Sequence, residues 1–152
     1  MTTARRRPKT MAEDAAVLAL KPMRYFSHDS DANRDIKCRK LIARHGVEGY
    51  GRWWLLCEAL ASTDNHRFDW GSDDERWILT DEIMFSDESD AQEFLSDCAD
   101  IGLINPELWG ECIVTSDRMN ENALYFGQRR EYGMRGARSK WCKRDTAESV
   151  GA

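Results

Sequence analysis

The chain of 152 residues lacks a long apolar run and lacks the short motifs that mark the common enzyme classes. No stretch approaches the roughly 20 apolar residues that a membrane span needs, and the basic start does not lead into a signal peptide. Paired Cys-x-x-Cys motifs, two His at helical spacing, Gly-x-Ser-x-Gly and the phosphate-cradling glycine loop are all missing. These absences give no support to a zinc site, a serine hydrolase or a nucleotide site. We therefore expect a protein that is not an enzyme, with no catalytic residue, metal, cofactor or membrane segment.

One stretch, residues 29–40, has part of the ligand spacing of a calcium loop. Asp29, Asp31 and Asn33 supply oxygen ligands at alternate positions. The position of the sharp-turn glycine holds Arg34, however, and the closing glutamate is replaced by Lys40. We therefore expect these side chains to cap a helix and not to bind calcium.

The five cysteines are odd in number, widely spaced and mostly set in apolar helical patterns. A disulfide framework would require pairing, so reduced, buried thiols are the expected state. Reduced thiols are typical of the cytosol. We therefore expect a cytoplasmic protein.

Large aromatic side chains are abundant, with six Trp, four Tyr and five Phe, and 32% of the residues are charged. This composition is typical of one globular domain. The punctuation by Pro and Gly divides the chain into a flexible N-terminal arm at residues 1–22, a domain at 23–126, and a basic Gly- and Arg-rich tail at 127–152.

Hydrophobic periodicity and capping residues predict the order of the elements. The pattern is mainly α with minor β, the order of a winged helix-turn-helix with a small β-hairpin and extra N- and C-terminal helices. The expected elements are a helix at 32–45 capped by Asp31 and stopped by Gly46, a helix at 48–62, a strand at 66–70, a helix at 73–84 with a Ser72–Glu75 capping box, a helix at 86–100 stopped by Gly102, a hairpin of 103–104 with 112–115, and a helix from 117 that loses order at Gly127, Gly133 and Gly136.

Charge is distributed unevenly along the chain. Residues 64–111 contain 2 basic and 15 acidic side chains, whereas residues 128–144 contain 7 basic side chains and one acidic side chain, Glu131. A molecule polarised in this way has two electrostatic faces, and each attracts a different class of partner.

The basic side chains predict weakly sequence-selective binding to DNA, since they can neutralise phosphates while interleaved aromatics stack on bases. Tyr132 and Trp141 are those aromatics. The predicted contacts are Arg34, Lys37, Lys40, Arg44, Arg129, Arg130, Arg135, Arg138, Lys140, Lys143 and Arg144.

The helix at 86–100 supplies the alternative site. Its acidic residues Asp90, Glu93, Asp97 and Asp100 share one face. They either solubilise the protein or form a surface that docks on a basic protein. In that second case the chain is a mobile-element inhibitor that blocks a nucleic-acid-binding host complex, such as a CRISPR effector.

Several stretches carry a family resemblance. They are YFSHD at 25–29, RKLIARHGVEGYGRWWLLCE at 39–58, SDRMNEN at 116–122 and the Gly- and Arg-rich run that ends at Trp141. Over residues 23–141 the chain resembles the N-terminal domain of phage replisome organiser proteins, the Lin1244/Lin1753-like group, which is related to the winged-helix end of DnaD-type primosomal proteins. The resemblance implies a winged-helix fold and a part in starting phage or mobile-element replication, through contacts with origin DNA and host replication proteins. Base recognition is not carried over, because the second helix of the helix-turn-helix is acidic here.

Overall fold

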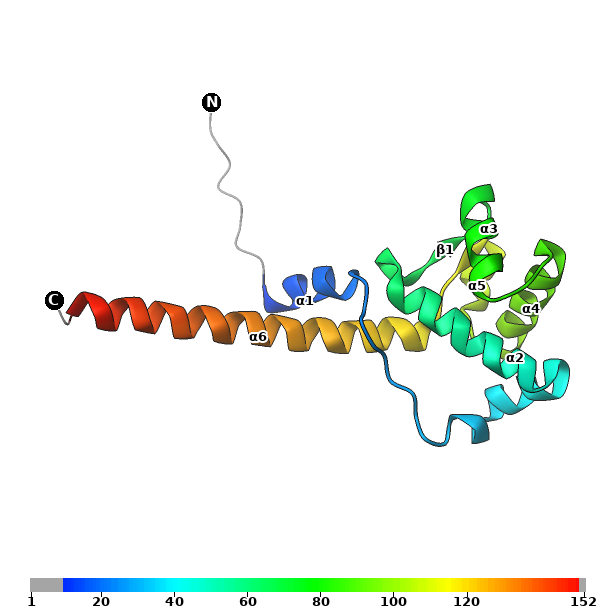
Figure 1. Cartoon of the computed structure of the whole chain (residues 1–152), viewed down its shortest axis with the longest axis horizontal. Coiled ribbons are helices and arrows are strands. Elements are labelled where there is room, and N and C mark those ends of the chain that lie inside the picture. Colours follow the sequence, from blue (N-terminus) through cyan, green and yellow to red (C-terminus); the bar gives the residue numbers. More distant parts are fainter. Residues whose placement is uncertain (1–9, 151–152) are drawn as a thin grey trace, which may run out of the picture.

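The computed structural model describes residues 10–150, and Figure 1 shows a body of short helices at one end of a long helix. The fold is mainly helical with one small antiparallel sheet, as the sequence predicts. The elements are α1 (Met11–Ala19), a 3-10 turn (Ala32–Arg34), α2 (Ile36–Ser62), a second 3-10 turn (Asp64–His66), β1 (Phe68–Asp69), α3 (Asp73–Glu82), α4 (Glu88–Ile101), α5 (Pro106–Gly110), β2 (Ile113–Val114) and α6 (Asp117–Val150).

Helix α2 contains a break at Gly46, whose φ of 70° lies in the left-handed region that glycine adopts without strain. The predicted stop at this residue is therefore a sharp kink between two helical segments. The predicted cap at Asp31 is wrong, since Asp31 makes no capping hydrogen bond. Asp35 caps the helix instead, because its carboxylate accepts from the backbone N–H of Lys37 at 2.9 Å and of Cys38 at 3.4 Å.

The small sheet joins β1 to β2, with Phe68 opposite Val114 and Asp69 opposite Ile113. The predicted pairing of residues 103–104 with 112–115 is wrong. The N–H groups of Leu103 and Ile104 donate to the carbonyl of Cys98 at 2.9 and 3.4 Å, so they complete the C-terminal cap of α4. Near the predicted hairpin, the N–H of Asn105 donates to the carbonyl of Thr115 at 2.9 Å, but residues 113–114 pair with β1 and not with residues 103–104.

Two predicted helix boundaries in the body are confirmed. The Ser72 hydroxyl accepts from the N–H of Glu75 at 3.4 Å and starts α3. The reciprocal half of the predicted capping box is missing, because the Glu75 carboxylate accepts from the N–H of Asp69 and the N–H of Ser72 donates to the carbonyl of Asp69. Gly102 ends α4 with a φ of 90°. These caps fix where α3 and α4 begin and end against the core.

The core lies between α2, α3, α4 and the sheet, where large apolar side chains are fully buried. Those with essentially no exposed area are Leu41, Leu56, Leu60, Leu79, Ile83, Leu95, Phe94, Ile104 and Val114. Cys38, Cys57 and Cys98 are also buried, and burial raises the pKa of each thiol. Cys112 and Cys142 are exposed, so the expectation of buried thiols holds for three of the five cysteines.

Helix α1 lies along α6 in Figure 1, and a glycine sets the distance between them. A Cβ atom at Gly127 would stand 2.5 Å from the carbonyl oxygen of Ala15 and 2.9 Å from the nitrogen of Ala19. Only a glycine permits this approach without a shift of one backbone. The expected loss of helical order at Gly127 is therefore wrong, because the residue is a packing contact inside a helix that continues to Val150.

The extra N-terminal helix that the sequence predicts lies within the N-terminal arm. Within it, residues 11–19 form α1, whose first turn is closed by reciprocal capping bonds between Thr10 and Glu13. Residues 1–9 lie outside the described part of the chain. The limits of the three predicted segments stay a prediction.

A buried histidine connects α1 to the body. The ring of His66 is 1% exposed, with Nδ1 2.8 Å from the carbonyl oxygen of Leu60 and Nε2 2.7 Å from that of Ala19. Its own carbonyl accepts from the Thr115 hydroxyl at 2.8 Å, just before α6 begins. One residue thus links the end of α1, the end of α2 and the start of α6.

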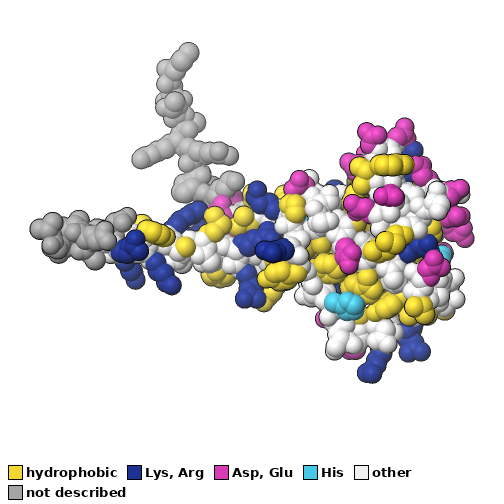
Figure 2. Space-filling view, in the orientation of Figure 1, with side chains coloured by type: hydrophobic (Ala, Val, Ile, Leu, Met, Phe, Trp, Pro, Cys, Tyr) yellow, Lys and Arg dark blue, Asp and Glu magenta, His cyan; other side chains and the backbone are white. Residues whose placement is uncertain are grey.

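Figure 2 shows the charge separation on the surface: Lys and Arg gather along α6, and Asp and Glu gather over α3 and α4. Across residues 10–150, no helix has both the length and the apolar character needed to cross a bilayer. In the view of Figure 2 the carboxylates are concentrated on the body, where some Lys and Arg side chains also lie, and Lys and Arg are most frequent along α6.

Candidate nucleic-acid interface

Helix α6 presents seven of the eleven predicted basic contacts, and five of them lie in its C-terminal half, residues 134–150, which projects from the body (Figure 1). Every residue from 132 to 144 is exposed. A helix of 34 residues is about 50 Å long. The helix thus carries its far end well beyond the packed core.

Some of the basic side chains in α6 already have partners. Arg135 pairs with the buried carboxylate of Glu131 and with Asp14 of α1 at 3.5 Å. Arg130 donates to the carbonyl of Pro22 at 3.3 Å. These bonds hold α6 to α1 and to Pro22, so the guanidiniums of Arg130 and Arg135 are less able to bind a ligand.

Other cations in α6 remain available to a ligand. Among the described residues, Arg138 and Lys140 form no ion pair, and both are exposed. The Arg129 guanidinium lies 5.8 Å from the centre of the Tyr125 ring, and that of Arg144 lies 4.4 Å from Trp141. These contacts leave the donor groups of both guanidiniums at the surface. Lys143 is exposed as well but is not free of partners.

Exposed aromatic side chains stand among these cations, as the sequence predicts. Tyr132 is 67% exposed and Trp141 is 59% exposed. An aromatic ring with one free face can stack on an unpaired base, and that contact tolerates any sequence. The combination of cations and free rings fits a nucleic-acid strand.

The predicted basic group at the start of α2 and in the 3-10 turn before it is less available. Arg44 bonds to Asp97 at 3.2 Å and to Asp100 at 2.7 Å, and the Asp100 hydrogen bond raises the pKa of Arg44. The Lys37 ammonium donates to the carbonyl of Gly102 at 3.1 Å. Arg34 and Lys40 are exposed and form no ion pair with a described residue. Half of this group is therefore neutralised or bound by α4.

The same contacts change the predicted acidic site on α4. Asp97 binds both Arg44 and His45, the latter at 2.7 Å, and Asp100 binds Arg44. Asp90 and Glu93 are exposed and unpaired among the described residues. Two of the four carboxylates thus serve the contact between α4 and α2.

The two basic groups lie apart in space. Figure 1 places the start of α2 at the end of the molecule remote from the C-terminus of α6. A single short stretch of DNA cannot contact both. The candidate interface is therefore the C-terminal half of α6 alone.

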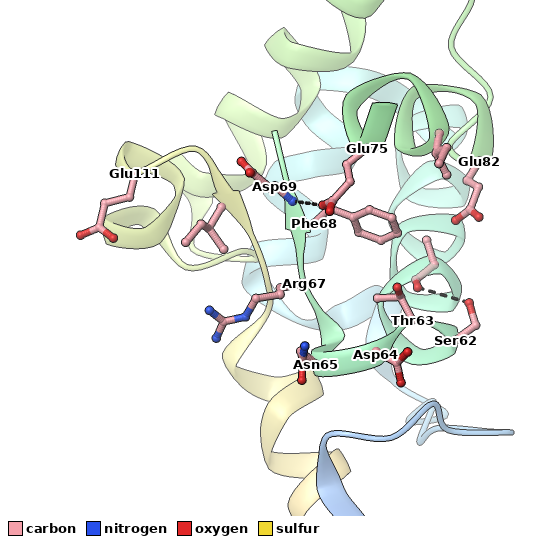
Figure 3. Close-up of a pocket in the computed structure, with 13 residues that line it drawn as sticks. Ser62, Thr63, Asp64, Asn65, Arg67, Phe68, Asp69, Glu75, Glu82 and Glu111 are labelled. Carbon is pink, nitrogen blue, oxygen red and sulfur yellow. Dashed lines mark hydrogen bonds between the residues drawn. The ribbon is translucent and has the colours of Figure 1, made fainter. Parts of the chain in front are cut away.

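An acidic groove of about 710 Å³ opens on the body between the end of α2, β1 and α3 (Figure 3). Its walls carry five carboxylates and one guanidinium, that of Arg67. Burial and the neighbouring Asp81 carboxylate raise the pKa of Glu82. The carboxylates are Asp64, Asp69, Glu75, Glu82 and Glu111.

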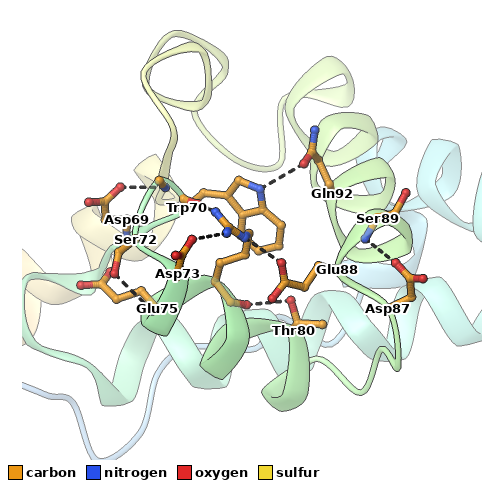
Figure 4. A network of polar contacts seen from close by, with 12 residues as sticks. Asp69, Trp70, Ser72, Asp73, Glu75, Thr80, Asp87, Glu88, Ser89 and Gln92 are labelled. Carbon is orange, nitrogen blue, oxygen red and sulfur yellow. Dashed lines mark hydrogen bonds and ion pairs between the residues drawn. The ribbon is translucent and has the colours of Figure 1, made fainter.

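A polar network fixes the helices next to this groove (Figure 4). The Trp70 indole donates to Gln92 at 3.4 Å, and the Thr80 hydroxyl donates to the carbonyl of Arg76 at 2.7 Å. The Arg76 guanidinium joins the carbonyl of Trp70 to Asp73 and Glu88. Arg76 is thus paired with Asp73 and Glu88, and not with Asp74 or Asp81 of α3.

Sequence reasoning missed the packing role of Gly127 and the junction at His66. For Gly127, the available signal was a glycine inside one predicted helix together with a second, alanine-rich helical stretch at residues 11–19 that could pack closely against it. No local signal existed for the His66 junction, since its partners lie 6 and 47 residues away.

Within the described residues, no three His, Cys, Asp or Glu side chains are grouped so as to hold a metal ion.

These features define a mainly helical domain with one two-stranded antiparallel sheet and a long basic C-terminal helix; the hairpin expected for the wing of a winged helix is not formed. The chain belongs to the Lin1244/Lin1753-like, N-terminal family, whose model matches residues 25–119. The body lies within the match and the C-terminal half of α6 lies outside it. Neither the search of curated proteins nor that of solved structures found a match to this chain.

Proposed function

We propose that this protein binds DNA through the C-terminal half of α6 and acts as an accessory factor in the initiation of phage or prophage replication. The observation that carries the proposal is the exposed run of cations and aromatic rings on a helix that leaves an acidic body. Family membership supports the replication role, since the group is related to DnaD-type primosomal proteins. The proposal places the protein in the cytoplasm of the bacterial host.

The expected binding is weakly sequence-selective. Cations on an exposed helix contact phosphates, and phosphate contacts carry no base information. The helix at the usual reading position, α4, is acidic and repels a duplex. Host replication proteins are the expected further partners.

The two exposed pairs of cations provide a matched test. Arg138→Gln with Lys140→Gln removes two charges from α6. Arg34→Gln with Lys40→Gln, the α2 variant, removes one charge from the 3-10 turn before α2 and one from α2 itself. Fluorescence anisotropy with labelled duplex and single-stranded DNA should give a salt dependence whose slope falls by up to about 2 in the α6 variant. The α2 variant should bind nearly as the parent does.

Absence of salt-sensitive binding at micromolar protein would remove the proposal. An equal loss in the two variants would move the interface off α6. The inhibitor alternative has weaker support, because Asp97 and Asp100 are bound to Arg44.

A further inference from the structure

The outer face of α3 carries large apolar side chains that nothing in residues 10–150 covers. Trp77 is 65% exposed and Ile78 is 41% exposed. Trp77 makes no ring contact with a described aromatic residue, whereas the buried Trp70 packs against Trp109. Trp77 and Ile78 are neighbours on this helix, and an exposed apolar surface with a polar rim is the kind of surface that contacts another protein.

Carboxylates surround this tryptophan on the same helix. Asp74 precedes Trp77 by three positions and Asp81 follows it by four, so both lie on its face of the helix. Neither forms an ion pair with a described residue. The one cation of α3, Arg76, is turned into the network of Figure 4. The face is therefore apolar at its centre and uniformly negative at its edge.

The acidic groove continues from this face. Ile78 lines the groove of Figure 3 together with Glu75 and Glu82, which occupy the next turns of the same helix. Asp64 and Glu111 stand elsewhere on its walls. A chain that covers Trp77 can thus extend into a groove of the same charge.

We propose that the Trp77 face of α3 and the adjoining groove form a docking site for an Arg- and Lys-rich segment of a protein partner. The negative charge of the face and of the groove identifies the occupant as a positively charged segment. A guanidinium stacks on an indole and bonds to carboxylates at the same time. A nucleic acid is repelled by this face, so the site is separate from the α6 interface and does not depend on DNA binding.

The test uses a fluorescein-labelled peptide of alternating Arg and Leu, titrated with the full chain and followed by anisotropy. Trp77→Ala should weaken binding about tenfold. Trp141→Ala, which truncates an exposed tryptophan on α6, is the matched control and should leave the affinity unchanged. Asp74→Asn with Asp81→Asn should also weaken binding, whereas Asp90→Asn with Glu93→Gln on α4 should not.

Three outcomes would overturn the proposal. The first is equal affinity of the parent and the Trp77→Ala protein, which would mean that the peptide senses net charge alone. The second is equal binding of a peptide with Glu in place of Arg. The third is self-association of the protein, measured by sedimentation velocity, that Trp77→Ala abolishes, since the occupant would then be a second copy of the chain. Trp77 is exposed, so the variant keeps the fold, and an unchanged circular dichroism spectrum verifies this.

Discussion

The body and the C-terminal half of α6 gain their order in different ways. In the body, side chains from α2, α3, α4 and β2 bury one another, with Phe94 and Leu56 among those without exposed area. Beyond residue 131, every described side chain of α6 is exposed. Packing therefore stabilises the body, whereas the end of α6 depends on backbone hydrogen bonds and local pairs. A region free of packing constraints can devote its side chains to a ligand.

The largest expected contrast comes from truncating one aromatic side chain in each region. Phe94→Ala should lower the free energy of unfolding by about 3–5 kcal/mol, because it leaves a cavity in the core. Trp141→Ala should change it by no more than about 0.5 kcal/mol. Urea denaturation followed by circular dichroism measures both. Similar losses in the two variants would mean that α6 packs as the body does.

A second contrast compares two glycines of α6. Gly127→Ala should cost about 1–3 kcal/mol, because the new methyl group meets the backbone of α1. Gly133→Ala meets nothing and should stabilise the helix by about 0.5–1 kcal/mol. Hydrogen exchange of the α1 amides should accelerate only in the first variant. Loss of α1 protection in both would contradict the packing role of Gly127.

A smaller effect is expected where the charges of α2 and α4 meet. Arg44→Gln removes the partner of Asp97 and Asp100 and should lower the thermal midpoint slightly at low salt. Added salt should reduce the difference, because the pair is exposed and screened. Arg34→Gln, which breaks no ion pair among the described residues, is the control. A salt-independent loss at Arg44 would indicate a packing role.

The smallest effect concerns Glu82, whose pKa is raised in the folded protein by burial and by Asp81. The folded state then holds this proton more tightly than the unfolded chain, so the carboxyl favours folding at low pH. Its contribution decreases as pH rises from the ordinary carboxyl pKa through the raised one. Glu82→Gln should therefore be at least as stable as the parent at pH 7 and lose that advantage in acid. A parent protein that gains stability over Glu82→Gln as pH rises would reverse the sign.

Local chemistry made the body's boundaries predictable. The N-cap at Ser72 and the positive φ of Gly102 act within a few residues, so these two sequence signals hold in the structure. The predicted hairpin is not formed, because the N–H groups of Leu103 and Ile104 donate to the C-terminal end of α4 although the two residues resemble a strand in sequence. Capping geometry overrode a weak strand signal.

The candidate sites were only partly predictable for a related reason. The cations of α6 were found because charge runs are visible in sequence. The pairing of Arg44 with Asp97 and Asp100 joins residues more than 50 positions apart, and no pattern encodes it. Trp77 was overlooked because exposure is a property of the folded surface.

The continuity of α6 has a mechanical consequence. Because the helix runs unbroken from Asp117 to Val150, anything held near its far end stays at a set separation from anything held on α3. The two would neither collide nor compete for room. Helix α6 would thus act as a spacer of fixed length between the two proposed binding surfaces.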